Sequence, residues 1–427
     1  MNYELKCNFV SMKVLIVSTS EKIGGAAIAA RRLLQALNKN GVHAKMLVRD
    51  KQTDDVKVVK TGSLLSDKLH FVSERAWILL HNRLSRQNLW SIDTGSDGTD
   101  ITTLPEFREA DVIHLHWINQ GFLSLDSLKK IFSSGKRVVW TMHDMWPCTS
   151  ICHHAGQCRG YETHCCNCHL LQSHGRHDLS YKVFEQKLKA LSCTTQGGTI
   201  MGSPLRFVAC SCWLEEQARK SALLHNFDVT CIPNPLDTHV FCPEDKVKAR
   251  TLLNLPLDKK LLLFGSLKVT DKRKGIDYLV VSADILAQTD NDIALVVMGQ
   301  KSEELQKLLP LPVYSMGYVT DDHQLAHIYN AVDAFVTPSL FENLPNTIAE
   351  AMSCGTPCVG FNVGGIPEMI HHKKDGYVAE YKNSKDLAEG IQYVLSHPEL
   401  GEAAIHSAVG SYSETRVAQR YIKIYEE

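Results

Sequence analysis

Short apolar runs alternate with helical patterns along most of the chain. The runs are rich in Val, Ile and Leu and bounded by turn residues, which is typical of strands buried in a parallel sheet. They fall at 12–18, 44–48, 111–117, 137–144 and 206–211 in the N-terminal half, and at 260–266, 294–299, 315–319, 334–337 and 357–361 in the C-terminal half. This alternation of strand and helix predicts an α/β protein with two doubly wound domains and a cleft between them.

The region from Ser63 to Trp90 has a mixed pattern. Its apolar residues are Leu64, Leu65, Leu69, Phe71, Trp77, Ile78, Leu79 and Leu80, and its basic residues include Lys68, Arg75, Arg83 and Arg86. The favoured interpretation is helices that pack on the N-terminal core and keep their basic faces in water. The alternative is a basic amphipathic patch that touches a membrane or a lipid-linked acceptor.

Charge and composition narrow the functional classes. The 427 residues include 46 Lys and Arg against 47 Asp and Glu. Binding to a nucleic-acid backbone needs a positive excess, so nucleic acid is not expected as a partner. No apolar run approaches the roughly 20 residues of a membrane helix. Residues 1–11 lack the basic start and apolar middle of a signal peptide, and are either a disordered extension or precede a true start at Met12. We expect a cytoplasmic protein, with peripheral association at the inner face of the membrane as an option.

The connection between the two halves is rich in proline. Pro233, Pro235 and Pro243 stiffen it, as expected of a linker between domains. The N-terminal domain is therefore expected to span 12–235 and the C-terminal domain 236–408. The remaining tail, 409–427, has a helical pattern.

Residues 337–360 combine the end of a strand, two acids and a helix. Glu342 follows the strand, and Glu350 lies inside the next helix, which Pro345 suits as a start and Gly355 as a stop. In open α/β sheets, ligands bind outside the carboxyl ends of the strands. Both acids are therefore expected to face a ligand crevice.

These residues resemble the family 4 retaining glycosyltransferases, which carry two Glu at this spacing in a strand–loop–helix of the GT-B fold. The sequences Pro338-Ser339, Glu350–Pro357 and Gly364–Glu368 strengthen the match. The resemblance covers the chain from Met12 to the end. It implies a GT-B fold with an N-terminal acceptor-side domain, a C-terminal nucleotide-sugar domain and a final helix that crosses back to the first domain.

The resemblance also implies roles for individual residues. Glu342 and His143 would bond the donor sugar, Glu350 the ribose hydroxyls, and His114 and His116 would pack near the crevice floor. The other residues implied to bind the nucleotide-sugar are Gly24, Gly25, Asn234, Asn343, Leu344, Gly364 and Gly365.

Two of these glycine pairs begin helices. From the residues alone, Gly24-Gly25 is either an anion-binding helix start or a tight strand–helix turn. Gly364-Gly365 is expected to present backbone N–H groups to the donor.

A basic turn follows the first strand of the C-terminal domain. Lys272, Arg273 and Lys274 could neutralise a diphosphate there, or could form an ordinary solvated turn. Family members usually have an Arg at the position of Ser266, so Arg273 or Lys272 would have to replace it, while Lys274 is retained.

A cysteine-rich insertion occupies residues 148–169. Cys152, Cys158, Cys165 and Cys168 can complete a tetrahedral Zn²⁺ site, with Cys166 spare and His153, His154, His164 and His169 as possible substitutes. The alternatives are an iron–sulfur cluster, free buried thiols or a disulfide. A four-thiolate shell leaves no open position for water, so the expected role is structural. No catalytic Mg²⁺ or Mn²⁺ is expected, on the premise that the chain has no Asp-x-Asp sequence.

Together these features predict a hexosyltransferase that moves a sugar from a UDP- or GDP-linked donor to a glycan or lipid-linked acceptor. Resemblance to transferases with a similar cysteine insertion implies bacterial capsule, exopolysaccharide or O-antigen biosynthesis. Two alternatives stay open. One is a different GT-B enzyme, such as an epimerase or phosphorylase, and the other is a zinc-organised interaction protein on an inactive scaffold.

Overall fold

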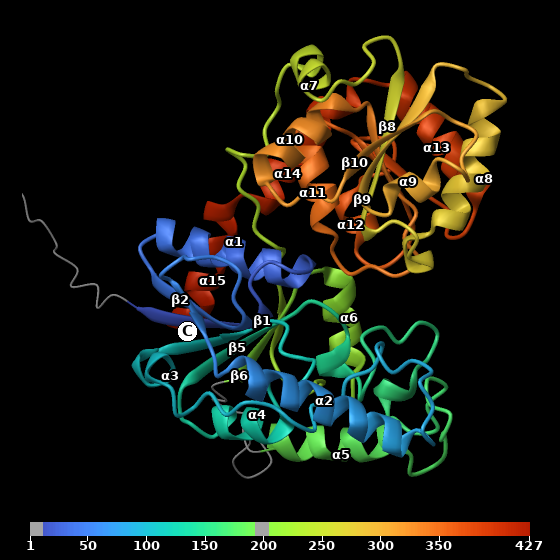
Figure 1. Ribbon diagram of the computed structural model, residues 1–427. Helices are drawn as coiled ribbons and strands as arrows, with labels where there is room; N and C mark the ends of the chain where they lie inside the picture. Colours follow the sequence, from blue (N-terminus) through green and yellow to red (C-terminus); the bar gives the residue numbers. More distant parts are fainter. Residues whose placement is uncertain (1–11, 193–204) are drawn as a thin grey trace, which may run out of the picture. The chain divides into compact units, whose positions relative to one another are not determined.

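The computed structural model describes residues 12–192 and 205–427, which form two compact units (Figure 1). The first unit comprises the described residues up to Cys210, together with Leu214–Ile232 and Ala418–Glu427. The second comprises Ser211–Trp213 and Pro233–Val417. The N-terminal segment 1–11, predicted as an extension, lies outside the described residues.

The first unit is built on a seven-stranded sheet with the order β3-β2-β1-β4-β5-β6-β7. All neighbouring strands are parallel. Crossovers between parallel strands are right-handed, so the reversal of winding between β1 and β4 puts the two sets of helices on opposite faces. The strands are β1 Lys13–Ser20, β2 His43–Asp50, β3 Val58–Lys60, β4 Val112–Leu115, β5 Arg137–Met142, β6 Leu205–Ala209 and β7 Val229–Cys231.

Helices connect these strands. They are α1 Gly25–Lys39, α2 Leu64–His81, α3 Pro105–Glu109, α4 Leu125–Phe132, α5 Leu179–Ser192 and α6 Cys212–Lys220, with short 3-10 turns at η1 Trp146–Cys148 and η2 Gly160–Glu162. Helix α1 buries the apolar face formed by Ala30, Leu33, Leu34 and Leu37, and Arg32 is buried as well.

Helix α15, Glu414–Glu426, brings the end of the chain to the first sheet. The Tyr425 hydroxyl lies 2.7 Å from Nδ1 of His114 on β4, and the Tyr421 hydroxyl lies 2.9 Å from Oγ1 of Thr141 on β5. Both tyrosines are fully buried. The last residues therefore form part of the core of the first unit.

The second unit is built on a six-stranded sheet with the order β10-β9-β8-β11-β12-β13, again entirely parallel. The strands are β8 Lys260–Lys268, β9 Ile293–Gln300, β10 Val313–Gly317, β11 Ala334–Thr337, β12 Cys358–Phe361 and β13 Gly376–Ala379. The helices are α7 Lys246–Leu252, α8 Ile276–Ala287, α9 Ser302–Leu305, α10 Asp322–Ala331, α11 Asn346–Ser353, α12 Ile366–Met369, α13 Ser384–Ser396 and α14 Leu400–Tyr412, with a 3-10 turn at η3 Lys272–Lys274. The predicted doubly wound arrangement is confirmed in both units.

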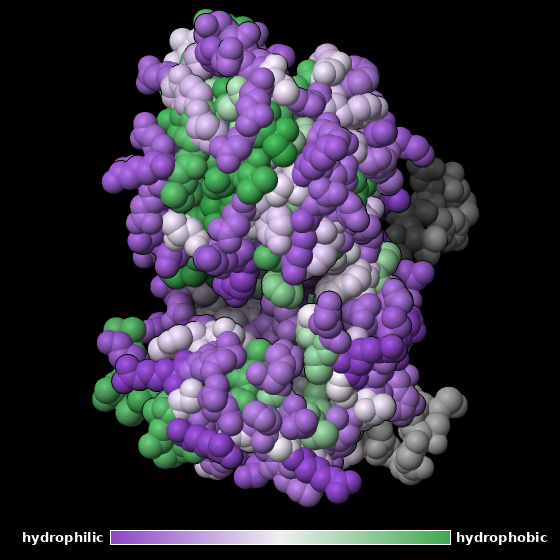
Figure 2. Space-filling model, turned by 90° about the vertical axis from the view of Figure 1, so that its right-hand side faces the viewer, coloured by the Kyte–Doolittle hydropathy of each residue, from purple (hydrophilic) through white to green (hydrophobic). Residues whose placement is uncertain are grey.

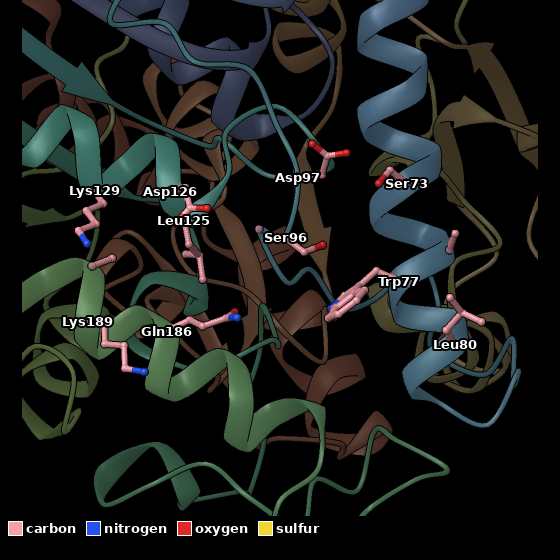
Figure 3. A pocket seen from close by; sticks show the side chains of 13 residues that line it. Ser73, Trp77, Leu80, Ser96, Asp97, Leu125, Asp126, Lys129, Gln186 and Lys189 are labelled. Carbon is pink, nitrogen blue, oxygen red and sulfur yellow. The ribbon is translucent and has the colours of Figure 1, made fainter.

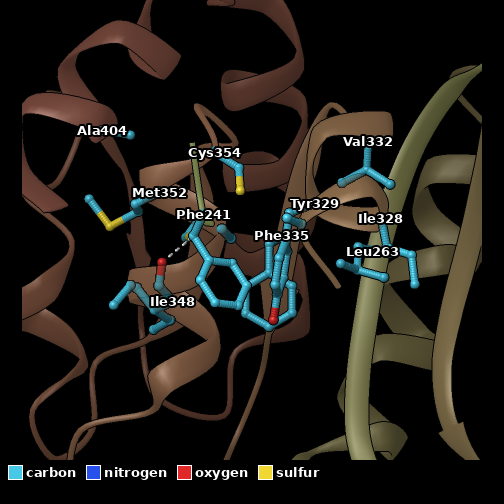
Figure 4. Close-up of a cluster of buried hydrophobic side chains, with 14 of the residues drawn as sticks. Phe241, Leu263, Ile328, Tyr329, Val332, Phe335, Ile348, Met352, Cys354 and Ala404 are labelled. Carbon is cyan, nitrogen blue, oxygen red and sulfur yellow. Dashed lines mark hydrogen bonds between the residues drawn. The ribbon is translucent and has the colours of Figure 1, made fainter. Parts of the chain in front are cut away.

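One core cluster of the second unit lies against α11, the helix with Glu350 (Figure 4). Phe241, Tyr329 and Phe335 pack together there, with ring centroids about 6 Å apart. The Ser353 hydroxyl donates a hydrogen bond to the backbone carbonyl of Phe241. The cluster therefore fixes the rotation of α11 about its axis.

The turn after β8 presses directly on the loop after β11. Gly275 has a φ of 74°, and a Cβ added to it would lie 1.7 Å from the carbonyl oxygen of Pro338. The backbone N–H of Leu340 donates to the carbonyl of Arg273 at 2.8 Å. Only glycine allows this approach, which keeps the basic turn in place.

We expect Gly275→Ala to lower the free energy of unfolding by at least about 2 kcal/mol, because the added methyl group meets both a forbidden φ and a backbone oxygen. Denaturant unfolding of the purified protein measures this change. The control is Gly410→Ala in α14, where an added Cβ meets nothing within 4 Å. That variant should be neutral or more stable, and equal stability of the two variants would contradict the expectation.

Candidate active site

Lys274 and Glu342 meet where the winding of the second sheet reverses. Strands β8 and β11 are neighbours, and Lys274 and Glu342 lie on the segments that follow their carboxyl ends. The Lys274 ammonium forms an ion pair with Oε1 of Glu342. The two side chains are 35% and 13% exposed, so the pair lies at the surface but is largely covered. Ligands of open α/β sheets bind at such a reversal point.

Glu350 is less accessible than its sequence position predicted. It is 4% exposed, and its Oε2 accepts a hydrogen bond of 2.8 Å from the Tyr329 hydroxyl of α10. A carboxylate fixed in this way supports the packing of α11 against α10. Its contact with a ribose stays a prediction.

The Gly364-Gly365 turn lies against the loop that carries Glu342. A Cβ at Gly364, whose φ is 57°, would lie 1.8 Å from the carbonyl oxygen of Glu342. The N–H of Gly365 donates to the carbonyl of Asn343 at 2.8 Å. The amide of Gly365 therefore already has a partner within the protein, unlike the free donor expected from the sequence. The glycines allow this turn to hold the Glu342 loop.

The other two cations of the basic turn are arranged differently from Lys274. The Arg273 guanidinium is held by both carboxylate oxygens of Asp271, and these hydrogen bonds raise its pKa. Lys272 points into solvent, with its ammonium 3.8 Å from Asp277. Of the three, Lys274 is the one paired with the predicted catalytic acid.

The polar residues predicted near the donor support the loops of the second unit. The Asn234 amide donates to Oδ1 of Asn346 at 2.9 Å, at the start of α11. Asn343 is buried and accepts a hydrogen bond from the Ser211 hydroxyl. Leu344 is partly buried against the core.

In the first unit, the Gly24-Gly25 turn begins the 15-residue helix α1. Gly24 has a φ of 92°, and an added Cβ would meet nothing within 4 Å, so open space lies beside this helix start. The buried Glu21 stabilises the turn, because it pairs with Arg31 and accepts the backbone N–H groups of Gln52 and Thr53. Nothing in the sequence indicated this role of Glu21.

A chain of histidines follows the carboxyl ends of β4 and β5. Nδ1 of His116 lies 2.9 Å from Nε2 of His143, and the Cys210 sulfur lies 3.4 Å from Nδ1 of His143. His114 lies between the Thr141 and Tyr425 hydroxyls. Both ring nitrogens of His143 therefore have protein neighbours. A hydrogen bond from His143 to a sugar would have to replace one of these two contacts.

Burial controls the protonation of these histidines. It lowers the pKa of His114 to about 3 and that of His143 to about 4, and keeps the pKa of His116 well below its ordinary value. All three are neutral at pH 7. They can donate and accept hydrogen bonds at the strand ends, but they place no positive charge there.

A buried network of charges that the sequence did not predict lies next to these histidines. The two ring nitrogens of His153 each lie 2.7 Å from a carboxylate, that of Asp144 and that of Asp93. Asp144 also accepts the indole N–H of Trp117, and Asp93 pairs with Arg75 of α2. His153, considered from the sequence as a substitute zinc ligand, is thus fully engaged elsewhere. Sequence spacing could not reveal these pairs, because their members are up to 60 residues apart.

The predicted zinc ligands lie on irregular backbone around η2. Burial, together with the nearby Cys152 and Cys158 thiols, raises the pKa of Cys165 and that of Cys168 to about 12. The four thiols are therefore close enough to act on one another electrostatically. In the described structure they are not gathered within 4.8 Å of one another.

A cavity of about 740 Å³ lies elsewhere in the first unit, between α2, α4 and α5 (Figure 3). Trp77 projects toward it from α2, and Lys129 and Lys189 line the opposite side. None of the site residues predicted from the sequence lines this cavity. It is therefore not assigned to the donor.

The premise that the chain has no Asp-x-Asp sequence is wrong, because one occurs at Asp290-Asn291-Asp292. The Asp290 carboxylate pairs with Lys260, and that of Asp292 with Lys259. These residues lie at the amino ends of β8 and β9, away from the carboxyl ends where Lys274 and Glu342 meet. Their position gives them no part in the candidate site.

Two family models match this chain. Residues 23–240 match the model described as Glycosyltransferase Family 4, and residues 258–397 match that of Glycosyl transferases group 1. Among curated proteins, the chain is similar to the N,N'-diacetylbacillosaminyl-diphospho-undecaprenol alpha-1,3-N-acetylgalactosaminyltransferase of Campylobacter jejuni, with 31% identity over 182 residues. That match covers 40% of this chain and 46% of the relative. The chain spans about half of the length of the curated relatives it matches.

Solved structures resemble nearly the whole chain. A glycosyltransferase from Rickettsia africae has a TM-score of 0.66 and 15% identity, covering 98% of both chains. The HepE protein of Anabaena, solved with UDP-glucose, has a TM-score of 0.59 and 16% identity, covering 97% of this chain and 99% of that one. At these identities the likeness shows the fold alone, and the fold is GT-B.

The buried histidines predict a loss of stability in mild acid. Their folded pKa values lie below the unfolded value of about 6.5, so below that pH the unfolded chain binds more protons than the folded one. Stability should be fully present above pH 6.5 and fall as the pH drops toward 4, by up to about 1.4 kcal/mol per pH unit for each such histidine. Urea unfolding from pH 7 to pH 4.5 measures this slope.

The control is His114→Asn, which removes one of these groups. The variant should be less stable at pH 7 but should lose less stability between pH 7 and pH 4.5. An unchanged slope would contradict the assignment of acid sensitivity to His114.

Proposed function

We propose that this chain, which belongs to glycosyltransferase family 4, transfers a sugar from a nucleotide-sugar donor to an acceptor hydroxyl with retention of anomeric configuration. The observation that carries the proposal is the Lys274–Glu342 pair at the reversal between β8 and β11. A cation and an acid at this position suit a donor that has a diphosphate at one end and a sugar at the other.

Lys274 stabilises the charge that develops on the leaving diphosphate. The ammonium is 35% exposed and its position is fixed by the Gly275–Pro338 contact, so it is oriented before the reaction begins. Without donor it neutralises Glu342. When a diphosphate binds, the ammonium is shared with phosphate oxygens, and Glu342 is released to accept hydrogen bonds from sugar hydroxyls.

The acceptor hydroxyl attacks on the face from which the nucleotide leaves. The bond from the anomeric carbon to the phosphate oxygen breaks, and the bond to the acceptor oxygen forms on the same face. The leaving phosphate takes the proton of the acceptor. No protein base is needed in this mechanism, which is compatible with the three buried histidines being neutral.

The donor is proposed to be a UDP-sugar, with a GDP-sugar as the competing candidate. Support comes from the HepE structures, whose ligands are UDP, glucose and UDP-glucose. The acceptor is proposed to be a lipid-linked or glycan hydroxyl in bacterial polysaccharide biosynthesis, because the Campylobacter relative is named for a diphospho-undecaprenol acceptor. We place the reaction at the cytoplasmic face of the membrane. Within the described residues, no helix is long and apolar enough to cross a bilayer.

We also propose that Cys152, Cys158, Cys165 and Cys168 bind one structural Zn²⁺. The backbone from Thr149 to Asp178 has only the single 3-10 turn η2, so this segment gains little stability from regular structure of its own. Cys152, Cys165 and Cys168 are partly buried and Cys158 is exposed, and the thiols act on one another electrostatically. Metal binding would draw them together as thiolates and stabilise this irregular segment.

Replacing the central cation should abolish most of the activity. We expect Lys274→Gln to lower the transfer rate about 100- to 1000-fold, because charge on the leaving group is no longer stabilised. The matched control is Lys272→Gln in the same turn, whose side chain points into solvent and which should keep most of the activity. Release of the free nucleotide and of glycosylated product from a panel of UDP- and GDP-sugars measures both.

The thermal midpoint of Lys274→Gln should stay within a few degrees of that of the unchanged protein, and UDP should raise it less. Normal transfer by Lys274→Gln would refute the assignment. If no nucleotide or nucleotide-sugar raises the thermal midpoint of the unchanged protein, an inactive scaffold would be favoured.

Metal analysis tests the zinc site. Freshly purified, reduced protein should carry about one zinc per chain, and Cys165→Ser and Cys168→Ser should each lose it and unfold at lower temperature. Cys166→Ser is the matched control, because the adjacent Cys166 is outside the proposed set. Absence of zinc from the unchanged protein, or equal loss in the control, would exclude this site.

A further inference from the structure

Helix α2 is placed on the first unit with its charged residues inward and its leucines outward. Asp67, Glu74 and Arg75 are buried, at 7%, 0% and 6% exposure. Eight large apolar residues of the helix and of the loop after it are exposed between 41% and 70%, namely Leu64, Leu65, Leu69, Val72, Trp77, Leu80, Leu84 and Trp90. Ile78 and Leu89 are buried, and Phe71 and Leu79 are half-buried. The favoured interpretation from the sequence placed the basic residues in water, and Lys68, Arg83 and Arg86 are indeed exposed, but most of the large apolar residues of this helix do not pack on the core.

The inward face is held by specific bonds. Glu74 accepts the backbone N–H groups of Thr94 and Gly95, each at 2.8 Å. Arg75 pairs with Glu74 and Asp93 and donates to the carbonyls of Leu89 and Ile92. A helix held in this way cannot rotate to bury its leucines, because rotation would leave Asp93 buried without its cation, at a cost of several kcal/mol.

Residues 64–90, all of which are described, place no acid on the outward face, because Asp67 and Glu74 are both buried. The acids Asp97 and Asp126 line the adjacent cavity. The basic residues Lys68, Arg83 and Arg86 are exposed beside the leucines. Figure 2 shows hydrophobic side chains reaching the surface in several places, so single exposed residues need no explanation. A continuous apolar face with a basic border on one helix does need one.

We propose that this face of α2 is a membrane-docking surface that lies in the interface of a bilayer with anionic lipids. Leucine, valine and tryptophan side chains enter the acyl boundary, while Lys68, Arg83 and Arg86 contact lipid phosphates. A protein partner would need an apolar surface with acidic residues around it, whereas a bilayer offers both features by default. The link between this surface and a lipid-linked acceptor rests on the proposed function. Binding of the surface to a membrane can be tested separately.

The cavity behind α2 opens on the same face. Ser73, Trp77 and Leu80 belong both to the cavity lining and to α2, and Trp77 and Leu80 are exposed apolar residues of the docking surface. A docked helix would therefore bring this cavity to the level of the lipid headgroups.

The test is co-sedimentation of the full chain with vesicles of phosphatidylcholine alone and of phosphatidylcholine with an equal share of phosphatidylglycerol. We expect binding that is stronger with phosphatidylglycerol and weaker in high salt. Replacing Leu65, Leu69, Val72 and Leu80 together by Ser should weaken it at least tenfold. Replacing Lys68, Arg83 and Arg86 by Gln should remove the preference for phosphatidylglycerol, roughly fivefold per charge.

The matched control replaces Val247, Leu252 and Leu257 by Ser, since these are exposed to a similar degree on the second unit. It should bind vesicles like the unchanged protein. All variants should keep their thermal midpoints and their stabilisation by UDP, so a failure to dock is distinguishable from a failure of the proposed transfer. No vesicle binding by the unchanged protein, or equal binding by the four-Ser variant, would overturn the inference. Dimerisation in water that the four-Ser variant abolishes, without vesicle binding, would overturn it in favour of a second copy of the chain.

Discussion

Parallel strands point all their carboxyl ends to one edge of a sheet, and this constraint places the candidate chemistry of both units. In the second unit, the edge brings Lys274 and Glu342 together from segments 68 residues apart. In the first unit, the edge brings His116 and His143 together, and the Gly24 turn follows β1, the neighbour of β4. Each sheet also reverses its winding at this edge, between β1 and β4 and between β8 and β11, which leaves a gap between the following loops.

The loops at the edge of the second sheet are held by glycines rather than by large side chains. Gly275 lies against Pro338, and Gly364 lies against Glu342, each at a separation that a Cβ would make impossible. Backbone packed this closely has little freedom, so the Lys274–Glu342 pair is positioned before any ligand arrives. For a reaction that depends on stabilising charge on a leaving group, such preorganisation matters more than additional contacts.

The first unit uses buried charge in a different way. Asp144, His153, Asp93 and Arg75 form a continuous chain of ion pairs from the end of β5 to helix α2. Buried ion pairs contribute little to net stability, because the desolvation of both partners offsets their attraction. They do fix orientation, and here they turn α2 so that its leucines face outward. The same network also ties the start of the cysteine-rich insertion to that helix.

The sequence by itself determined the class of fold and most of the strand and helix positions. The period of apolar residues is local information, and it was sufficient to predict two parallel sheets and the Glu342–Glu350 strand–loop–helix. The two acids and the sequences around them also indicated the family, whereas the meeting of Lys274 and Glu342 depends on β8 and β11 being neighbours in the sheet.

Only the tertiary structure decided which polar groups are engaged and which face of a helix is buried. Glu350 bonds to Tyr329, the amide of Gly365 bonds to Asn343, and His153 is held between two carboxylates, although the sequence had left each of them open to a ligand. The sequence also left open which face of α2 lies inward. Hydrophobic periodicity defines two faces of a helix, but partners distant in the sequence, here Asp93 and the backbone of Thr94 and Gly95, determine which of them lies inward.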